Sequence, residues 1–133
     1  MLVNILVVDD SKIMRNSIKA VLSKMKIACN FIEATDGKQA LAELGTQSVD
    51  LVLLDWTMPK LSGLEFLKEV RSQEKHKTLP IIMVTSKTAR GDVMDAIQNG
   101  ATDYVTKPIN VNLFMEKLSR LPLFKNHAES GGR

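Results

Sequence analysis

The sequence has 133 residues, a length that fits one domain and leaves little room for a second. Lysine and arginine number 18 against 15 aspartate and glutamate residues, so the formal net charge is +3, and 44% of the residues are hydrophobic. This composition is ordinary for a soluble globular domain with a core of its own. The single cysteine, Cys29, excludes an internal disulfide and favours a reducing, cytoplasmic location.

Zinc-site, membrane and secreted classes are also excluded. The two histidines, His76 and His127, lie far apart without cysteine neighbours, which is unlike a zinc site. Apolar runs such as residues 51–54 are far shorter than the about 18 residues that span a bilayer. The first apolar stretch meets Asp9 without a basic start, so no signal peptide is expected.

Short apolar segments alternate with longer amphipathic ones along the chain. Residues 4–8 are apolar without alternation and predict a buried strand, and residues 12–26 follow as an amphipathic helix. The pattern then predicts a strand at 30–33, a helix from 36 to Gly45, a strand at 51–54, a helix at 64–71, a strand at 79–84, a helix at 92–99 closed by Gly100, a strand at 103–105 and a helix at 110–121.

Five strands therefore alternate strictly with five helices. Parallel strands need long crossovers, and a helix in each gap predicts an open, doubly wound α/β sheet covered on both faces. This domain is expected to span residues 1–121. Residues 122–133 are polar and glycine-rich, which predicts a flexible C-terminal tail too short for an output domain.

Sites in open parallel sheets form at the carboxyl ends of the strands. The residues at those ends are Asp9 and Asp10 after the first strand, Asp55 after the third, Thr85 and Ser86 after the fourth, and Lys107 after the fifth. The pattern does not fix the order of the strands. These side chains gather at one edge only if the first, third, fourth and fifth strands are neighbours.

Three carboxylates at one edge would repel one another unless a cation neutralises them, and an all-oxygen set suits Mg²⁺. One carboxylate could then act as a nucleophile toward phosphorus. Lys107 and Thr85 would offer a cation and a hydroxyl donor to the transferred group. Alternatively, strand-end Asp and Thr residues often cap the next helix, an interpretation that suits Asp9 or Thr85 singly better than the whole set.

Five segments together carry a family resemblance over about residues 3–121. They are Val-Val-Asp-Asp-Ser (7–11), Leu-Leu-Asp-Trp-Thr-Met-Pro (53–59), Leu-Ser-Gly-Leu (61–64), Met-Val-Thr-Ser (83–86) and Tyr-Val-Thr-Lys-Pro (104–108). In this order they resemble response-regulator receiver domains, most closely the single-domain chemotaxis kind (CheY-like). The resemblance implies the flavodoxin-like strand order 2-1-3-4-5.

The resemblance also implies a metal site and a phosphoacceptor. Asp55 would accept the phosphoryl group. Asp10 and Asp55 would bind one Mg²⁺ per chain together with the backbone carbonyl of Thr57, and Asp9 would act through a water. Lys107 would pair with Asp55 and then with the phosphoryl group, its side chain aimed by a cis peptide bond before Pro108.

Further residues would make up the switch. Thr85 would move toward the phosphoryl group, Ser86 is small enough to leave it room, and Tyr104 would turn inward behind Thr85. From spacing alone, Tyr104 could instead be an edge-strand aromatic that covers the last helix. Thr57 and Lys87 would set the lifetime of the phosphorylated state, and neither is the amide or acid that close relatives often carry, which argues against rapid self-dephosphorylation.

The implied function is a switch in a two-component system, with catalysis limited to its own phosphorylation and slow dephosphorylation. Its partners would be a sensor histidine kinase or phosphotransfer domain, a target such as the flagellar switch or another effector, and a phosphatase. The target would bind the surface of the fourth and fifth strands and helices. Nucleic acid is not expected as a partner. The basic residues of segment 12–26 form either a solvated face or a docking surface for an acidic kinase helix.

Three alternatives stay open. The chain could be a stand-alone receiver of a phosphorelay outside chemotaxis. A haloacid-dehalogenase-like phosphohydrolase also uses an Asp nucleophile, Mg²⁺, Thr and Lys, but it requires a second Asp where this chain has Thr57. A receiver that is never phosphorylated would serve as a scaffold, although the acidic set is complete.

Overall fold

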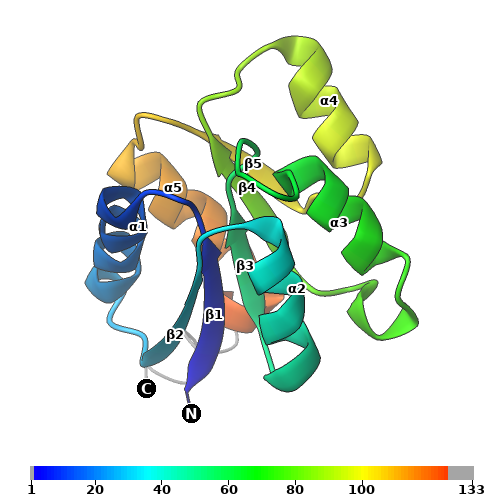
Figure 1. Cartoon of the computed structure of the whole chain (residues 1–133). Helices are drawn as coiled ribbons and strands as arrows, with labels where there is room; N and C mark the ends of the chain where they lie inside the picture. Colours follow the sequence, from blue (N-terminus) through cyan, green and yellow to red (C-terminus); the bar gives the residue numbers. More distant parts are fainter. Residues whose placement is uncertain (1, 126–133) are drawn as a thin grey trace.

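The computed structural model describes residues 2–125, which form a five-stranded sheet between two layers of helices (Figure 1). All strand pairs are parallel, and the order across the sheet is β2-β1-β3-β4-β5. The strands are β1 (Val3–Val8), β2 (Cys29–Ala34), β3 (Leu51–Leu54), β4 (Ile81–Thr85) and β5 (Asp103–Thr106). The predicted doubly wound α/β fold and its 2-1-3-4-5 order are confirmed.

Five main helices connect and follow the strands, as predicted. They are α1 (Lys12–Lys24), α2 (Gly37–Thr46), α3 (Gly63–Arg71), α4 (Arg90–Gln98) and α5 (Val111–Ser119). Helices α1 and α5 cover one face of the sheet, and α2, α3 and α4 lie on the other side (Figure 1). A short 3₁₀ helix, η1 (Glu74–His76), was not predicted.

The core divides along the pleat of the strands. Ile5 of β1 packs in the same cluster as Ile18 of α1 and Phe114 of α5. Leu6, the next residue, belongs to the opposite cluster with Phe66 of α3. Because both faces of the sheet are buried, the strands read as continuous apolar runs without alternation.

Side chains cap the N-termini of most of the helices, in the loops that follow the strands. Four caps accept a hydrogen bond from the backbone N–H three residues later: Ser11, Asp36, Ser62 and Asn110. Ser62 and Glu65 form a reciprocal capping box, in which the Glu65 carboxylate accepts from the Ser62 N–H at 3.0 Å. These caps fix the entry of α1, α2, α3 and α5 close to the loops that carry the polar strand ends.

Several helix and strand boundaries in the structure differ from the predicted ones. Helix α2 continues past Gly45 to Thr46, because Gly45 is not in the left-handed conformation that ends a helix, whereas Gly100 (φ 104°) is and follows α4 as predicted. Strand β4 starts at Ile81 rather than at residue 79, since Pro80 has no N–H for the ladder. Helix α1 ends at Lys24, before Lys26 turns left-handed at φ 57°.

The C-terminal boundary is also corrected. Residues 122–125 form a helical turn in which the N–H groups of Phe124 and Lys125 donate to the Leu121 carbonyl at 3.0 Å. Phe124 is buried beside Leu118 in the cluster of α1 and α5. The prediction of a flexible tail is therefore wrong for 122–125, because an aromatic ring anchors them in the core. The rest of that tail, residues 126–133, lies outside the described residues.

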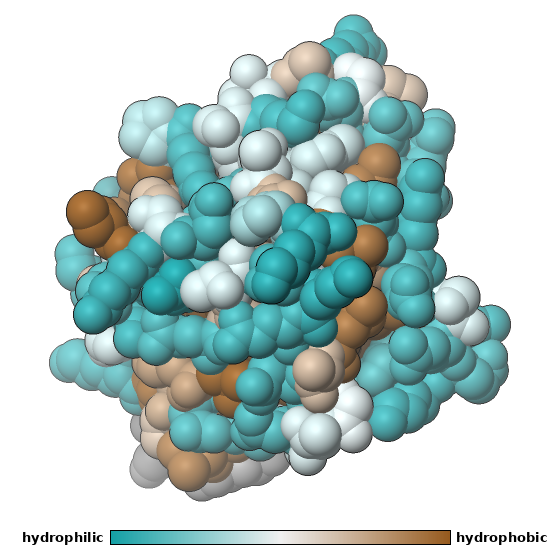
Figure 2. All heavy atoms as spheres, viewed as in Figure 1, coloured by the Kyte–Doolittle hydropathy of each residue, from teal (hydrophilic) through white to brown (hydrophobic). Residues whose placement is uncertain are grey.

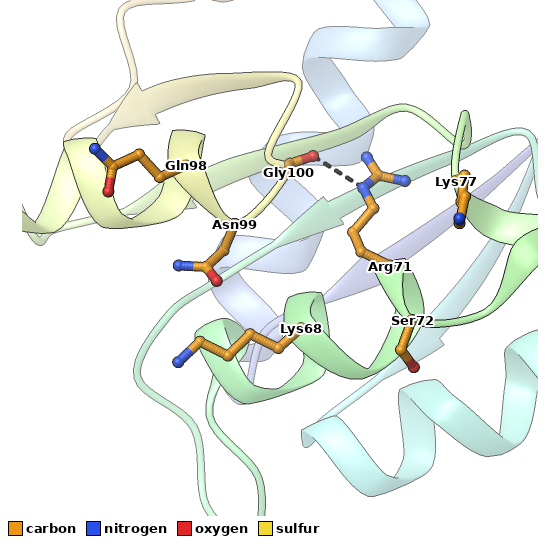
Figure 3. A pocket seen from close by; sticks show the side chains of 7 residues that line it. All are labelled: Lys68, Arg71, Ser72, Lys77, Gln98, Asn99 and Gly100. Atoms are coloured by element: carbon orange, nitrogen blue, oxygen red, sulfur yellow. Dashed lines mark hydrogen bonds between the residues drawn. The ribbon is translucent and has the colours of Figure 1, made fainter.

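Arg71 ties the end of α3 to the segments on either side of it. Its Nε donates to the Gly100 carbonyl at 2.9 Å (Figure 3), and its Nη1 donates to the His76 carbonyl at 2.6 Å. The side chain lines an open cavity between α3 and the end of α4, together with Lys68 and Lys77. The guanidinium is thus occupied by carbonyl groups near the ends of α4 and η1, which gives it a structural role.

The exterior is mainly hydrophilic on the face that Figure 2 shows, with small scattered hydrophobic areas. Within residues 2–125, no helix has both the length and the apolar character needed to cross a membrane.

Gly63 is the position where a side chain would disturb the fold most directly. A Cβ there would lie 2.1 Å from the Asp55 carbonyl oxygen and 2.8 Å from the Cα of Trp56. We expect Gly63→Ala to lower the free energy of unfolding by roughly 1–3 kcal/mol or more, measured by urea denaturation. The control Gly45→Ala has no atom within 4 Å of its new methyl and should gain about 0.5–1 kcal/mol. Equal stability of the two variants would contradict this packing.

Candidate functional site

Three carboxylates meet where β1 and β3 end. Val8 and Leu54, the last residues of these strands, are direct partners in the register, and the Asp55 N–H donates to the Val8 carbonyl at 2.9 Å. The chain therefore delivers Asp9 and Asp10 from one strand and Asp55 from its neighbour to a single edge. One carboxylate oxygen of each lies within 4.8 Å of the others. The structure thus brings together the three acids singled out in the sequence.

The three acids differ in their surroundings. Asp9 is 1% exposed and Asp55 is 7% exposed, whereas Asp10 is open to solvent. The Oδ1 atom of Asp9 accepts from the Ser11 N–H at 2.9 Å, and that of Asp55 accepts from the Trp56 N–H at 2.7 Å. Backbone donors therefore orient the two buried carboxylates, and the third stays free to turn toward a ligand.

Lys107 provides the positive charge of the cluster. Its Nζ lies 2.8 Å from Asp9 Oδ2 and 3.2 Å from Asp55 Oδ2, so it bridges both acids rather than pairing with Asp55 alone. Burial by itself lowers the pKa of Lys107, but its hydrogen bond to Asp9 and the charges of Asp55 and Asp9 raise that pKa above its usual value. The peptide bond between Lys107 and Pro108 is cis, as expected.

The donor set fits a hard divalent cation. All three side chains offer carboxylate oxygens, the ligands that Mg²⁺ prefers, and the single ammonium cannot balance three negative charges. The exposed position of Asp10 leaves an open side for further oxygen ligands. Thr57 lies two residues beyond Asp55 in the loop after β3, and its side chain is exposed.

A hydroxyl group lies at the end of the next strand. Thr85 ends β4, is 1% exposed, and its Oγ1 accepts from the Lys87 N–H at 3.4 Å. Its carbonyl accepts from the Lys107 N–H at 2.9 Å, which ties the ends of β4 and β5 together. Ser86, the next residue, is exposed.

Tyr104 is buried on the side of the sheet away from α5. It packs in the cluster that contains Phe66 of α3 and Ala96 of α4, whereas Phe114 of α5 belongs to the opposite cluster. The alternative interpretation, an aromatic that covers the last helix, is therefore wrong. The side chains of β5 alternate between the two faces, so Val105 and not Tyr104 packs with α5.

Three interactions of α1 near the site have no signal in the sequence. Arg15 donates from Nε to Glu33 at 2.9 Å and from Nη1 to the Asp9 carbonyl at 2.8 Å, and Lys19 also pairs with Glu33 at 3.1 Å. Hydrogen bonds from Arg15 and Lys19 lower the pKa of Glu33. Glu33 of β2 thus neutralises part of the basic face of α1. This pairing depends on how α1 packs against β2.

Comparison with known proteins finds relatives over most of the chain. The response regulator receiver domain family matches residues 5–119. The chemotaxis protein CheY of Pseudomonas aeruginosa is 38% identical over 117 residues, which cover 88% of this chain and 94% of that protein. The structure of Vibrio cholerae CheY4 is similar with a TM-score of 0.79 and 32% identity, covering 90% of this chain and 98% of that one.

A third relative is described together with a metal. It is the receiver domain of a sensor histidine kinase from Pseudomonas aeruginosa, with a magnesium ion coordinated in its active-site cleft. Its TM-score is 0.78 and its identity 30%, over 90% of this chain and 97% of that one.

The buried phenol of Tyr104 gives a testable pH dependence. Burial and the charges of Asp92 and Asp55 raise its pKa from 10.0 to about 12. Because the folded pKa is raised, the stabilisation from the neutral phenol is complete below pH 10 and is lost as the pH rises toward 12. Tyr104 is the only tyrosine, so phenolate absorbance reports it alone, with Tyr104→Phe as the blank. A midpoint near 10 in a protein still folded by circular dichroism would contradict this environment.

Proposed function

The chain belongs to the response regulator receiver domain family, and from this premise we propose that it is a phosphorylation-activated switch of a two-component system. Asp55 is the phosphoacceptor, and the donor is a phosphohistidine on a sensor histidine kinase or its phosphotransfer domain. The observation that supports this most strongly is the Lys107 ammonium between Asp9 and Asp55, beside the exposed Asp10. The cluster keeps an excess of negative charge that suits a cation, and the ammonium suits a phosphoryl group.

The transfer is a displacement at phosphorus. A carboxylate oxygen of Asp55 attacks, the new O–P bond forms as the P–N bond of phosphohistidine breaks, and that electron pair stays on the imidazole nitrogen. Lys107 then pairs with the oxygens of the transferred group. The Trp56 N–H on Asp55 Oδ1 keeps the carboxylate oriented throughout.

One Mg²⁺ ion per chain would be held by Asp10, Asp55 and the backbone carbonyl of Thr57, with Asp9 acting through a water. Its chemistry, when bound, is to neutralise the charge of the phosphoryl oxygens. The grouping of the three acids and the magnesium in the related kinase receiver domain support this assignment.

The conformational change begins at Thr85 and extends to the β4–α4 loop at the surface. A phosphoryl group on Asp55 attracts the Thr85 hydroxyl, and the small side chain of Ser86 leaves it room. The loop after β4 follows, because the Lys87 N–H is bonded to the Thr85 hydroxyl, and Tyr104 responds through the Lys87 carbonyl. The phosphoryl group shifts the population of loop states only by binding them differently.

The target-binding surface consists of β4, α4, β5 and α5. It carries exposed apolar side chains: Met94 and Ile97 on α4 and Leu113 on α5. Chemotaxis is the favoured pathway because of the CheY relatives, with the flagellar switch as the target and another effector as the alternative.

The kinase docks beside the site at the start of α1. Ile13, at 78% exposed, lies in the first turn of α1, just after the acids of β1. Since Arg15 and Lys19 already pair with Glu33, docking depends more on Ile13 and Lys12 than on the whole basic face. Thr57 and Lys87 set the phosphoryl lifetime, and because neither offers an amide or a carboxylate, loss of the group is slow without a phosphatase.

Intact-mass measurement tests the acceptor. With acetyl phosphate and Mg²⁺, the wild-type chain should gain one phosphoryl group, and Asp55→Asn should gain none because the nucleophilic oxygen is lost. Asp95→Asn removes an exposed acid on α4 and should react like the wild type. A chelator should abolish the reaction in the wild type and in Asp95→Asn. A wild-type chain that stays unmodified, or Asp55→Asn modified equally, would refute the assignment.

A further inference from the structure

Lys87 lies where three groups of the switch meet. It is two residues beyond Thr85, in the loop between β4 and α4. Its ammonium lies 5.3 Å from the centroid of the Trp56 ring. Its carbonyl accepts from the Tyr104 hydroxyl at 2.6 Å, and its N–H donates to the Thr85 hydroxyl at 3.4 Å. One residue thus touches the loop after β3, the end of β4 and the aromatic residue of β5.

The contact with Trp56 connects this loop to the acceptor. The Trp56 N–H donates to Asp55 Oδ1 at 2.7 Å, so the residue that carries the indole is bonded to the acceptor carboxylate. A cation over an indole face is attracted by the ring quadrupole, and tryptophan is the best of the aromatic partners. The Lys87 ammonium therefore restrains the β4–α4 loop against the loop that holds Asp55.

The burial of Tyr104 depends on the position of the same β4–α4 loop. The side chain is 6% exposed, and its hydroxyl uses the Lys87 carbonyl as acceptor. If the loop moves away, a buried hydroxyl loses its partner, which is unfavourable unless the ring turns out to water. The position of Lys87 and the burial of Tyr104 are thus coupled.

We propose that Lys87 is a positioning residue: its ammonium holds the β4–α4 loop on Trp56 and thereby keeps Tyr104 buried. The contacts of Lys87 with Trp56, Thr85 and Tyr104 all lie within this chain. The consequence for signalling rests on the proposed function, since a loop already held in this position has less distance to move when Asp55 is phosphorylated. Removing the cation should make the position of Tyr104 depend more strongly on the phosphoryl group.

Fluorine NMR can observe both aromatic partners separately, because the chain has one tyrosine and one tryptophan. The full chain is labelled with 3-fluorotyrosine or 5-fluorotryptophan, and the change of each resonance between H₂O and D₂O reports its exposure. The variants are Lys87→Met, which keeps the length and removes the charge, and Lys87→Arg, whose guanidinium can also stack on indole. Lys60→Met is the matched control, since it removes an exposed cation from the loop that follows Trp56.

Lys87→Met should raise the ratio of exposed to buried Tyr104 about two- to fivefold, the shift expected for a partly exposed cation–π contact. Lys87→Arg should restore the wild-type resonances, and Lys60→Met should leave them unchanged. Thermal melting of each variant checks that all are folded. Unchanged resonances in Lys87→Met, or an equal change in Lys60→Met, would overturn the proposal.

A second experiment adds acetyl phosphate and Mg²⁺. The Tyr104 resonance should move further toward the buried position in Lys87→Met than in the wild type. If mass shows the phosphoryl group on both chains and their resonances move equally, the role of Lys87 fails while the proposed function stands. If the wild-type chain takes up no phosphoryl group, the proposed function fails, and the first experiment still decides whether Lys87 positions Tyr104.

Discussion

The ammonium of Lys107 between two buried carboxylates is the interaction on which the site depends. Asp9 and Asp55 are both nearly inaccessible and close to Asp10, so their charges would repel strongly without a cation. One ammonium against three carboxylates leaves the cluster with an excess of negative charge. The imbalance, open to solvent at Asp10, is what makes this edge suitable for a divalent cation and a phosphoryl group.

The sheet holds these charges together at short range because its strands end in register. The Asp55 N–H is bonded to the last residue of β1, so the acids of the two strands cannot separate without breaking the ladder. The return of the chain into α3 is equally constrained, since Gly63 approaches the Asp55 carbonyl more closely than any side chain allows. Backbone packing, rather than side-chain contacts alone, therefore keeps the repelling carboxylates in place.

The residues of the site could be predicted from the sequence because buried parallel strands end abruptly, and the first polar residue after each apolar run marks the functional edge. That pattern does not predict the order of the strands in the sheet, which only the family resemblance implies. Contacts between elements also left no periodic signal. The pairing of Arg15 with Glu33, the anchoring of Phe124 and the face on which Tyr104 lies each depend on how a helix or strand is placed against its neighbour.

The contact between Lys87 and Trp56 has a strength suited to a switch. A cation–π pair at a partly exposed site contributes about 0.5–1 kcal/mol, whereas hydrogen bonds to a charged group contribute about 1.5–3 kcal/mol each. In the proposed switch, the weaker contact would bias the β4–α4 loop, and a phosphoryl group on Asp55 that is hydrogen-bonded to Thr85 and Lys107 would outweigh it. The free energies of the two loop states then stay close enough for both states to be populated, which is the condition for a population shift. A buried ion pair at the same place would fix one state and remove the response.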